Sequence, residues 1–189
     1  MNAVEFLNTV HTLEGLKNDT RHSYTSSGRH ESVAEHTYRI TLMAFFIRDE
    51  FPELDGDKLI RMCLIHDLGE IFTGDIPSFL KKPSDEENEI SKLYGWVKSL
   101  PEPYRSEMLS LYDEMTERKT LEAKVFKALD NLEAVIQHNE ADLSTWSENE
   151  FTLNLTYGAD KCSFSDYLTQ LRKLVRRETE EKIASSVQP

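Results

Sequence analysis

The sequence contains few residues of the kinds that mark strand-rich or disulfide-bonded proteins. Its 189 residues include only seven glycines and six prolines, too few for many strands joined by tight turns. The two cysteines, Cys63 and Cys162, cannot form the framework of paired cysteines that small secreted domains use. Cys63 lies in the apolar run 62–65, so it is predicted to be a core side chain rather than a reactive thiol.

Long apolar runs and an excess of positive charge are also missing. The longest uncharged apolar run, residues 40–47, is far shorter than the roughly 20 residues that span a bilayer. The first residues lack the basic region and apolar stretch of a secretory signal, so we expect a cytoplasmic protein. Acids outnumber bases by 34 to 22, for a net charge of -12. Binding to nucleic acid or to anionic membranes is therefore not expected, because its non-specific part depends on Lys and Arg.

Apolar residues recur mostly every three or four positions, which predicts an all-α protein. A first helix covers about 4–13 and ends near Gly15, and the polar segment 15–31 is predicted to be a loop that serves a site. Ser32 and Glu35 form a capping box that starts a helix running to about residue 50. Further helices are predicted at about 57–69, 85–99, 104–115, 121–140, 147–157 and 163–184, with a break within 113–118. No strand is expected.

The third predicted helix ends in the pair His66-Asp67, followed by Glu70. On a helix, the spacings i,i+4 and i,i+3 place these three side chains toward one side. A histidine and two acids at the end of an apolar helix must be solvated, paired with one another, or bound to a metal ion. The spacing alone leaves a simple ion pair at the helix end as an alternative.

Two more residues fit a metal site. His36 lies in the first turn of the capped helix, where the helix dipole favours the neutral, metal-binding imidazole. Asp130 lies among apolar residues of the predicted helix 121–140 and needs a partner there. Two imidazoles and two carboxylates suit a divalent first-row cation, with water in the remaining positions. A buried polar network without an ion is the alternative.

The order of His36, His66-Asp67 and Asp130, within the segments ESVAEH and HDLGEIFTGDIP, resembles the HD-domain phosphohydrolases. Within that superfamily the chain is similar to the small single-domain 5'-deoxynucleotidase group. The resemblance implies that these four residues hold one divalent metal ion, with Mn, Co, Fe, Mg and Zn all compatible with the ligands. Between His66 and His138 there is no histidine to build a second site, which favours a single ion. His11 and His138 are expected to be surface residues.

The resemblance also assigns the residues around the metal. It implies that Glu70 and Asp75 are the catalytic acids and that Arg21 orients the substrate phosphate. Arg39 either faces the same cleft or forms a surface salt bridge. The segment lining the substrate pocket comprises Asp75, Ile76, Pro77 and Ser78. The family has a Trp after the phosphate arginine, where it is thought to exclude a ribose 2'-hydroxyl, but this chain has His22 there, which predicts a broader sugar tolerance.

The expected activity is hydrolysis of (deoxy)nucleoside 5'-monophosphates to nucleoside and phosphate. The alternatives are an HD-domain phosphodiesterase or oxygenase acting on another substrate, and a nucleotide-binding HD domain without catalysis. We expect a single HD domain over residues 1–189, with a metal-binding core at about 32–140 and C-terminal helices over 145–185 packed on it. Related proteins are commonly dimers, so a homodimer is expected here as well.

Overall fold

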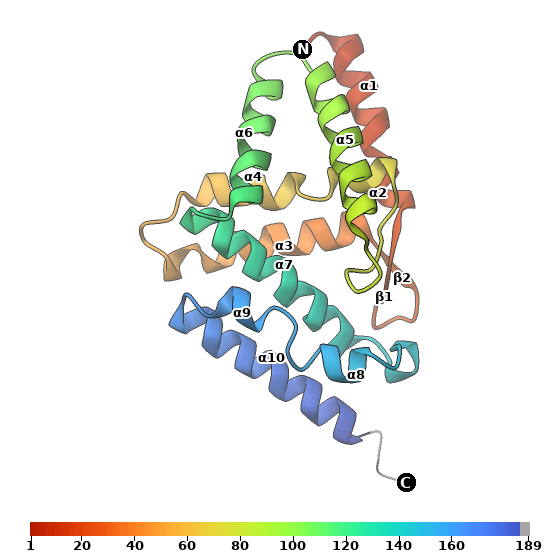
Figure 1. The fold of residues 1–189 in the computed structure, drawn as a ribbon, viewed down its shortest axis with the longest axis vertical. Helices are drawn as coiled ribbons and strands as arrows, with labels where there is room; N and C mark the ends of the chain where they lie inside the picture. Colours follow the sequence, from red (N-terminus) through yellow and green to blue (C-terminus); the bar gives the residue numbers. More distant parts are fainter. Residues whose placement is uncertain (186–189) are drawn as a thin grey trace.

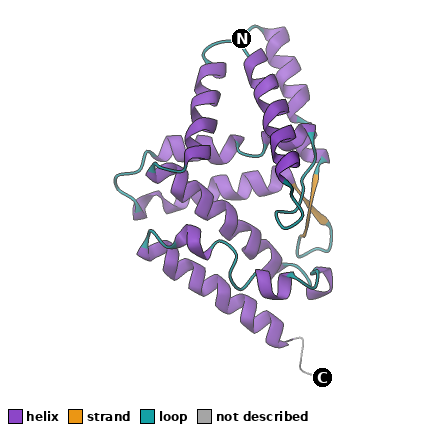
Figure 2. Cartoon of the chain, in the orientation of Figure 1, coloured by secondary structure: helices purple, strands orange, loops and turns teal. Residues whose placement is uncertain are grey.

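Helices make up most of the chain, as the apolar periodicity predicts (Figure 2). The structure is a computed structural model that describes residues 1–185. In chain order the elements are α1 (Ala3–Leu13), α2 (Gly15–Asn18), β1 (Thr20–Tyr24), β2 (His30–Ser32), α3 (Val33–Ile47), η1 (Arg48–Glu50), α4 (Gly56–Ile65), η2 (Leu68–Phe72), α5 (Pro83–Ser99), α6 (Tyr104–Glu117), α7 (Leu121–Glu140), η3 (Leu143–Thr145), α8 (Glu150–Leu153), α9 (Ala159–Cys162) and α10 (Asp166–Ser185).

Helix α7 is the centre of the fold. It packs against α3, α4 and α6 on one side and against α9 and α10 on the other (Figure 1). Side chains around most of its circumference are buried, as expected of a helix enclosed by others. The largest apolar side chains that are fully buried include Ile40, Leu59, Leu129, Leu132 and Leu168. Cys63 is also buried and forms no disulfide, which confirms the prediction that it is a core side chain.

The capping box at the start of α3 is confirmed. The Ser32 hydroxyl accepts a hydrogen bond from the Glu35 amide at 3.3 Å, and the Glu35 carboxylate accepts one from the Ser32 amide at 2.9 Å. These bonds satisfy two of the amide groups that a helix start leaves without partners. The local sequence thus fixes where α3 begins, and with it the position of His36 in the first turn.

The polar segment before α3 is not an irregular loop. Residues 20–32 form an antiparallel hairpin of β1 and β2, in which Thr20 pairs with Ser32 and Tyr24 with His30. Gly28 in the connecting turn has a φ of 82°, a conformation that favours glycine. The expectation of no strand is therefore wrong in this segment. The strands are too short and too polar to show an alternating apolar pattern. A residue from a distant helix also stabilises β1, because the Gln137 side chain of α7 donates to the Tyr24 carbonyl at 2.7 Å.

The third predicted helix ends earlier than its periodicity suggests. Helix α4 stops at Ile65, and Asp67, with φ -98° and ψ 15°, leads into the short 3-10 helix η2. The Tyr112 hydroxyl donates to the Ile65 carbonyl at 2.5 Å. The carbonyl of the last residue of α4 is thus bonded to a residue of α6. The prediction that His66 and Glu70 share one helical face is therefore wrong.

The remaining helix boundaries agree with the sequence in part. Helix α7 has the predicted bounds, and α5 and α10 lie within three residues of theirs. Of the break expected within 113–118, only the last residue lies outside a helix, because α6 continues to Glu117 and the chain reverses at Arg118, whose φ is 54°. The helix at 147–157 is reduced to the single turn of α8. None of the helices within residues 1–185 has the length and apolar character needed to span a bilayer.

Candidate functional site

Four side chains from three parts of the fold converge on one point. His36 comes from α3, His66 and Asp67 from the end of α4, and Asp130 from α7. The Nε2 atom of His36 lies 3.3 Å from Nε2 of His66 and 3.3 Å from Oδ1 of Asp130. Oδ2 of Asp67 lies 2.9 Å from Nε2 of His66 and 3.7 Å from Nε2 of His36. The turn that ends α4, rather than a regular helix, brings His66 and Asp67 to this position.

These residues fit a divalent cation. The five separations that join Nε2 of His36 or His66 to the other ligand atoms lie between 2.9 and 3.9 Å. Each is less than twice the roughly 2.0–2.2 Å of a bond from such an ion to nitrogen or oxygen, so one ion can reach both imidazoles together with either carboxylate. Burial raises the pKa of Asp67, but the imidazoles of His66 and His36 outweigh it and lower the pKa to about 2. Burial also opposes ionisation of Asp130, yet Lys127 and His36 hold its pKa well below the usual value. Both carboxylates are therefore ionised, as metal ligands must be.

The charges around His36 also favour a bound cation. Burial and Arg21 act to lower the pKa of its imidazole, but Glu133 and Asp130 outweigh them and raise it to about 9. The buried acids thus favour a positive charge at this point, so the expectation that the helix dipole keeps this imidazole neutral is wrong. A bound cation would supply that charge in place of the imidazole proton.

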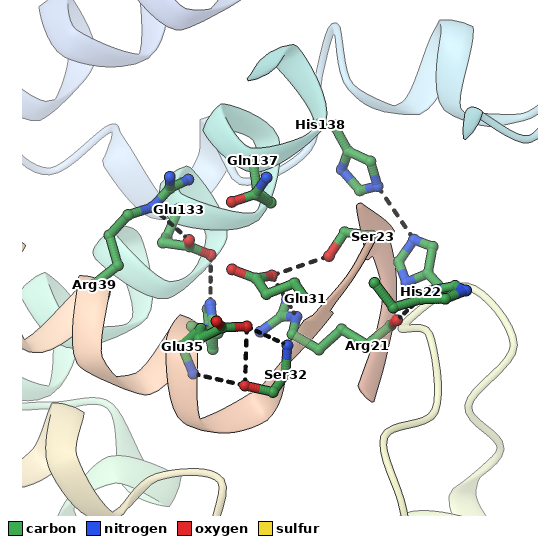
Figure 3. A network of polar contacts seen from close by, with 12 residues as sticks. Arg21, His22, Ser23, Glu31, Ser32, Glu35, Arg39, Glu133, Gln137 and His138 are labelled. Carbon is green, nitrogen blue, oxygen red and sulfur yellow. Dashed lines mark hydrogen bonds and ion pairs between the residues drawn. The ribbon is translucent and has the colours of Figure 1, made fainter. Parts of the chain in front are cut away.

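Both imidazoles are oriented by contacts at their other nitrogen. His36 Nδ1 contacts the fully buried Glu133 carboxylate. The same carboxylate accepts a hydrogen bond from Arg39 Nε at 2.7 Å, and Figure 3 shows these two side chains. His66 Nδ1 lies 2.8 Å from the Cys63 carbonyl and donates to it. Such contacts fix the tautomer that leaves Nε2 free for a metal ion. Arg39, for which the sequence left two roles open, supports Glu133 and also pairs with Glu140.

Sequence reasoning missed Glu133. The signal was available, because Glu133 follows Asp130 by three residues and so lies on the same face of a helix. An acid within the otherwise apolar stretch of a buried helix needs a partner inside the protein. Without the structure, nothing identified His36, 97 residues earlier, as that partner.

A cavity of about 400 Å³ opens beside the candidate metal centre. Its wall contains every other residue that the sequence predicted for the site, together with Asp67 and Asp130 of the centre itself. The predicted residues in the wall are Arg21, His22, Glu70, Asp75, Ile76, Pro77 and Ser78. Residues that lie far apart in the sequence thus share one small chamber, whose size suits a small molecule.

Two carboxyl groups in the cavity wall, those of Glu70 and Asp75, have raised pKa values. Glu70 is only 8% exposed, and its Oε2 atom has no hydrogen-bond partner within residues 1–185. Burial, followed by repulsion from Asp67 and Asp75, raises its pKa well above the usual value. Burial also raises the pKa of Asp75, with Asp67 adding to the effect. Raised pKa values of this kind suit acid–base catalysis near neutral pH.

The backbone fixes where Asp75 points. Gly74 has a φ of 76°, which a residue with a side chain adopts only with strain. The Asp75 amide then donates to the Asp19 carboxylate at 3.0 Å. This turn after η2 holds Asp75 against the end of α2 and directs the following segment along the cavity.

Arg21 supplies positive charge to the same cavity. It projects from β1, and its Nε atom lies 3.5 Å from the Glu31 carboxylate, which the Ser23 hydroxyl also contacts at 3.0 Å (Figure 3). Burial lowers the pKa of Arg21, but the negative charges of Glu133, Asp67 and Glu31 raise it by more. The guanidinium therefore stays charged. The hairpin that sequence reasoning missed is thus the element that carries Arg21 into the site.

His138 is not the surface residue that was expected. It is only 7% exposed and its Nε2 atom lies 2.8 Å from Oε1 of Glu150. Nε2 of His22 lies 2.8 Å from the same oxygen, and the His22 ring meets the edge of Phe79. The sequence gave no sign of this cluster, because 116 residues separate His22 from His138.

The comparison with known protein families agrees with this arrangement. The model of the HD domain family matches residues 13–172, which include the candidate metal ligands and the residues that line the cavity. The chain belongs to the HD domain family. Among relatives of this HD-domain protein, the human 5'-deoxynucleotidase HDDC2 is 33% identical over 139 residues, which cover 72% of this chain and 67% of the relative. The HDDC2 of Dictyostelium discoideum is 28% identical over 174 residues, or 86% and 90% of the two chains.

A solved structure shares the fold over almost its full length. The crystal structure of a predicted metal-dependent phosphohydrolase from Magnetospirillum magnetotacticum MS-1 superposes with a TM-score of 0.78 at 26% identity. The match covers 97% of this HD-domain protein and 96% of that chain. The expected all-α fold and the expected family are both confirmed, with the hairpin of β1 and β2 as the one sheet within residues 1–185.

Proposed function

We propose that this HD-domain protein hydrolyses (deoxy)nucleoside 5'-monophosphates to nucleoside and phosphate. The observation that carries the proposal is the meeting of three features in one cavity. These are two ionised aspartates of the candidate metal centre, an arginine whose side chain is 13% exposed, and two carboxyl groups with raised pKa values. The relatives named 5'-deoxynucleotidases support the choice of substrate.

The proposed mechanism divides the work among the residues of the cavity. A divalent cation held by His36, His66, Asp67 and Asp130 would supply Lewis-acid charge to a phosphate oxygen and to the attacking water. Arg21 binds and orients the phosphate, since phosphoryl transfer depends mainly on positioning and charge compensation.

Two carboxyl groups would carry the protons. Of Glu70 and Asp75, one takes a proton from the attacking water and the other gives one to the leaving 5'-oxygen. Glu70 lies closer in the chain to the ligand Asp67, one short turn away, which favours it as the group that holds the water.

We also propose that the protein accepts ribose as well as deoxyribose. An imidazole is smaller than an indole, and the His22 ring is drawn toward Glu150, so the bulk that would exclude a 2'-hydroxyl is reduced. The test is a screen of matched deoxy- and ribonucleoside 5'-monophosphates with Mn²⁺, Co²⁺, Mg²⁺, Fe²⁺ and Zn²⁺, with phosphate release as readout. We expect kcat/KM for the two sugars to agree within about tenfold, a difference of ~1.4 kcal/mol.

The same screen separates the competing functions. A thousandfold preference for deoxyribose would contradict the role proposed for His22 and leave the nucleotidase proposal intact. Turnover of phosphodiesters alone, oxygen consumption, or nucleotide binding with no turnover under any metal would contradict the nucleotidase proposal itself.

We infer that the chain is one HD domain, with the metal-binding core at about 32–140, and that it resides in the cytoplasm. Helix α10 packs on α7, so the C-terminal helices add to the core that holds Asp130.

Both cysteines are buried thiols, which fits the reducing compartment of the cytoplasm. Cell fractionation with detection of the native protein tests the location, and recovery in a membrane or secreted fraction would contradict it.

We propose a homodimer formed through the apolar surface around α1. This helix leaves Val4, Phe6 and Leu7 more than half exposed. Next to it, an apolar groove is lined by residues of α1, α3 and α4, among them the exposed Tyr38 and Leu64. Apolar surface of this kind is buried favourably by a second copy.

Sedimentation velocity tests the dimer. We expect twice the 21.9 kDa of one chain, and a monomer after Leu64→Glu, because burying an unpaired charge in the interface is costly. Leu174→Glu, at an exposed position on α10, is the matched control and leaves the dimer intact. A monomer for the unmodified protein at micromolar concentration would contradict the proposal.

A further inference from the structure

A second cluster of ligand-type side chains lines the same cavity. It consists of His22 from β1, His138 from α7 and Glu150 from α8 (Figure 3 shows the two histidines). Oε1 of Glu150 lies 2.8 Å from Nε2 of His22 and 2.8 Å from Nε2 of His138. The two Nε2 atoms are 3.3 Å apart. All three residues line the cavity.

This geometry suits a metal ion. The three atoms form an acute triangle whose sides are all shorter than twice the roughly 2.0–2.2 Å of a Zn–N or Zn–O bond, so one ion reaches all three. The separation of the two Nε2 atoms equals that between His36 and His66 in the first centre. We propose that His22, His138 and Glu150 form a second site for a divalent first-row cation such as Zn²⁺.

Ser147 fixes the orientation of the Glu150 carboxylate. Oε2 of Glu150 accepts hydrogen bonds from the Ser147 amide at 2.6 Å and from the Ser147 hydroxyl at 2.7 Å. These bonds turn Oε1 toward the histidines, in the way that outer contacts orient metal ligands. Burial raises the pKa of Glu150, but hydrogen bonds from His138, His22 and Ser147 outweigh it and lower the pKa. The carboxylate is ionised, as binding a cation requires.

The second site binds its ion more weakly than the first. When an ion occupies Nε2 of a neutral imidazole, the ring proton lies on Nδ1. In the first centre both Nδ1 atoms have acceptors, Glu133 for His36 and the Cys63 carbonyl for His66. Nδ1 of His138 is buried and has no partner among the residues that the structure describes. Leaving that N–H unpaired reduces the affinity.

Three protein ligands leave coordination positions open. Imidazole and carboxylate sites with open positions are used to bind and polarise oxygen atoms of small molecules. Because the cluster lines the same cavity as Arg21, the open positions would take an oxygen of the molecule bound there, such as a hydroxyl or a phosphate oxygen. This site adds a second cation to the one-ion mechanism proposed above and does not depend on it.

Metal counting tests the proposal. The metal-free full-length protein is titrated with ZnCl₂ by calorimetry, and bound zinc is measured by elemental analysis after equilibrium dialysis. We expect two Zn²⁺ per chain with different affinities. Glu150→Gln should bind one, because its amide oxygen can keep the bonds from Ser147 while its NH₂ group faces the histidines and cannot coordinate. Asp130→Asn should also bind one, and the double variant none.

Matched controls identify non-specific losses. Glu148→Gln removes the same charge from an exposed position two residues away and should keep two ions. If Glu150→Gln fails to fold by circular dichroism, His138→Gln replaces it, with the exposed His11→Gln as its control. One zinc per chain in the unmodified protein, or equal stoichiometry in the unmodified protein and the folded cluster variant, would overturn the second site. Since no nucleotide is present, that outcome would leave the proposed hydrolysis standing.

Discussion

Replacing Glu70 by glutamine lowers kcat by about 10²–10⁴-fold, the usual contribution of a general acid or base, and leaves the metal ion bound. Glutamine has the same shape but cannot take or give the proton. The change should be well tolerated by the fold, because Oε2 of Glu70 makes no hydrogen bond within residues 1–185. The measurement is phosphate release from a nucleoside 5'-monophosphate at saturating substrate, with bound metal determined on the same samples.

The control for Glu70 is a second acid at the same cavity. Glu86 also lines it but is exposed, so Glu86→Gln removes one negative charge with little effect on kcat. Activity within tenfold of the unmodified protein for Glu70→Gln would exclude the acid–base role. Loss of the metal ion together with the activity would instead assign Glu70 to holding the ion.

Asp130→Asn abolishes binding of the first ion and lowers activity by at least about 10³-fold, since several kcal/mol of charge stabilisation are lost with the cation. Asparagine keeps the shape of the side chain but lacks the charge that pairs with Lys127 and faces His36. Metal affinity and phosphate release are measured at increasing Mn²⁺, with thermal unfolding to confirm that the variant is folded.

Glu133 provides the matched comparison, because it contacts His36 without belonging to the four ligands. Glu133→Gln weakens metal binding by about 10–100-fold, as is usual when the partner of a ligand histidine is changed. Excess Mn²⁺ should restore the activity of this variant but not that of Asp130→Asn. Rescue of both variants, or of neither, would contradict the distinction drawn here between ligand and supporting residue.

The acidity of the chain does not oppose binding of an anionic substrate. The net charge of -12 describes the whole protein, whereas a phosphate in the cavity would meet the charge of Arg21 and of a bound cation. Several of the acids surround the metal centre, where a cation would offset their charge. The excess of acids still opposes general binding to polyanions, which depends on many exposed bases.

Local sequence was sufficient where a helix start or a regular apolar stripe decides the structure. The capping box of Ser32 and Glu35 fixed the start of α3, and the long stripe of α7 fixed both of its ends. His36 and Asp130 were placed on their helices for this reason. In the structure His36, His66, Asp67 and Asp130 lie close to one another, as the resemblance implied. Their role as metal ligands remains a prediction, which the Asp130 and Glu133 variants test.

Local sequence failed where a distant contact decides the conformation. Helix α4 ends at Ile65, whose carbonyl is bonded to Tyr112, 47 residues later. The hairpin that carries Arg21 and His22 is held by Gln137, 113 residues from Tyr24. The spacing of apolar residues reflects only neighbours within one helix or strand. It therefore could not predict the end of α4 or the hairpin.

The sequence by itself determined the helical class, the family and the residues suited to a metal centre, because these follow from short-range spacing and from motifs of consecutive residues. Only the tertiary structure decided that Glu133 supports His36, that Glu70 lines the cavity from the 3-10 helix η2 rather than from α4, and that His138 contacts His22 and Glu150. For Glu133 and for the cluster of His138, His22 and Glu150 the physical reason is that a buried charge or imidazole needs a partner, and packing, not sequence distance, decides which partner is within reach. For Glu70 the reason is that the end of α4 is set by packing as well.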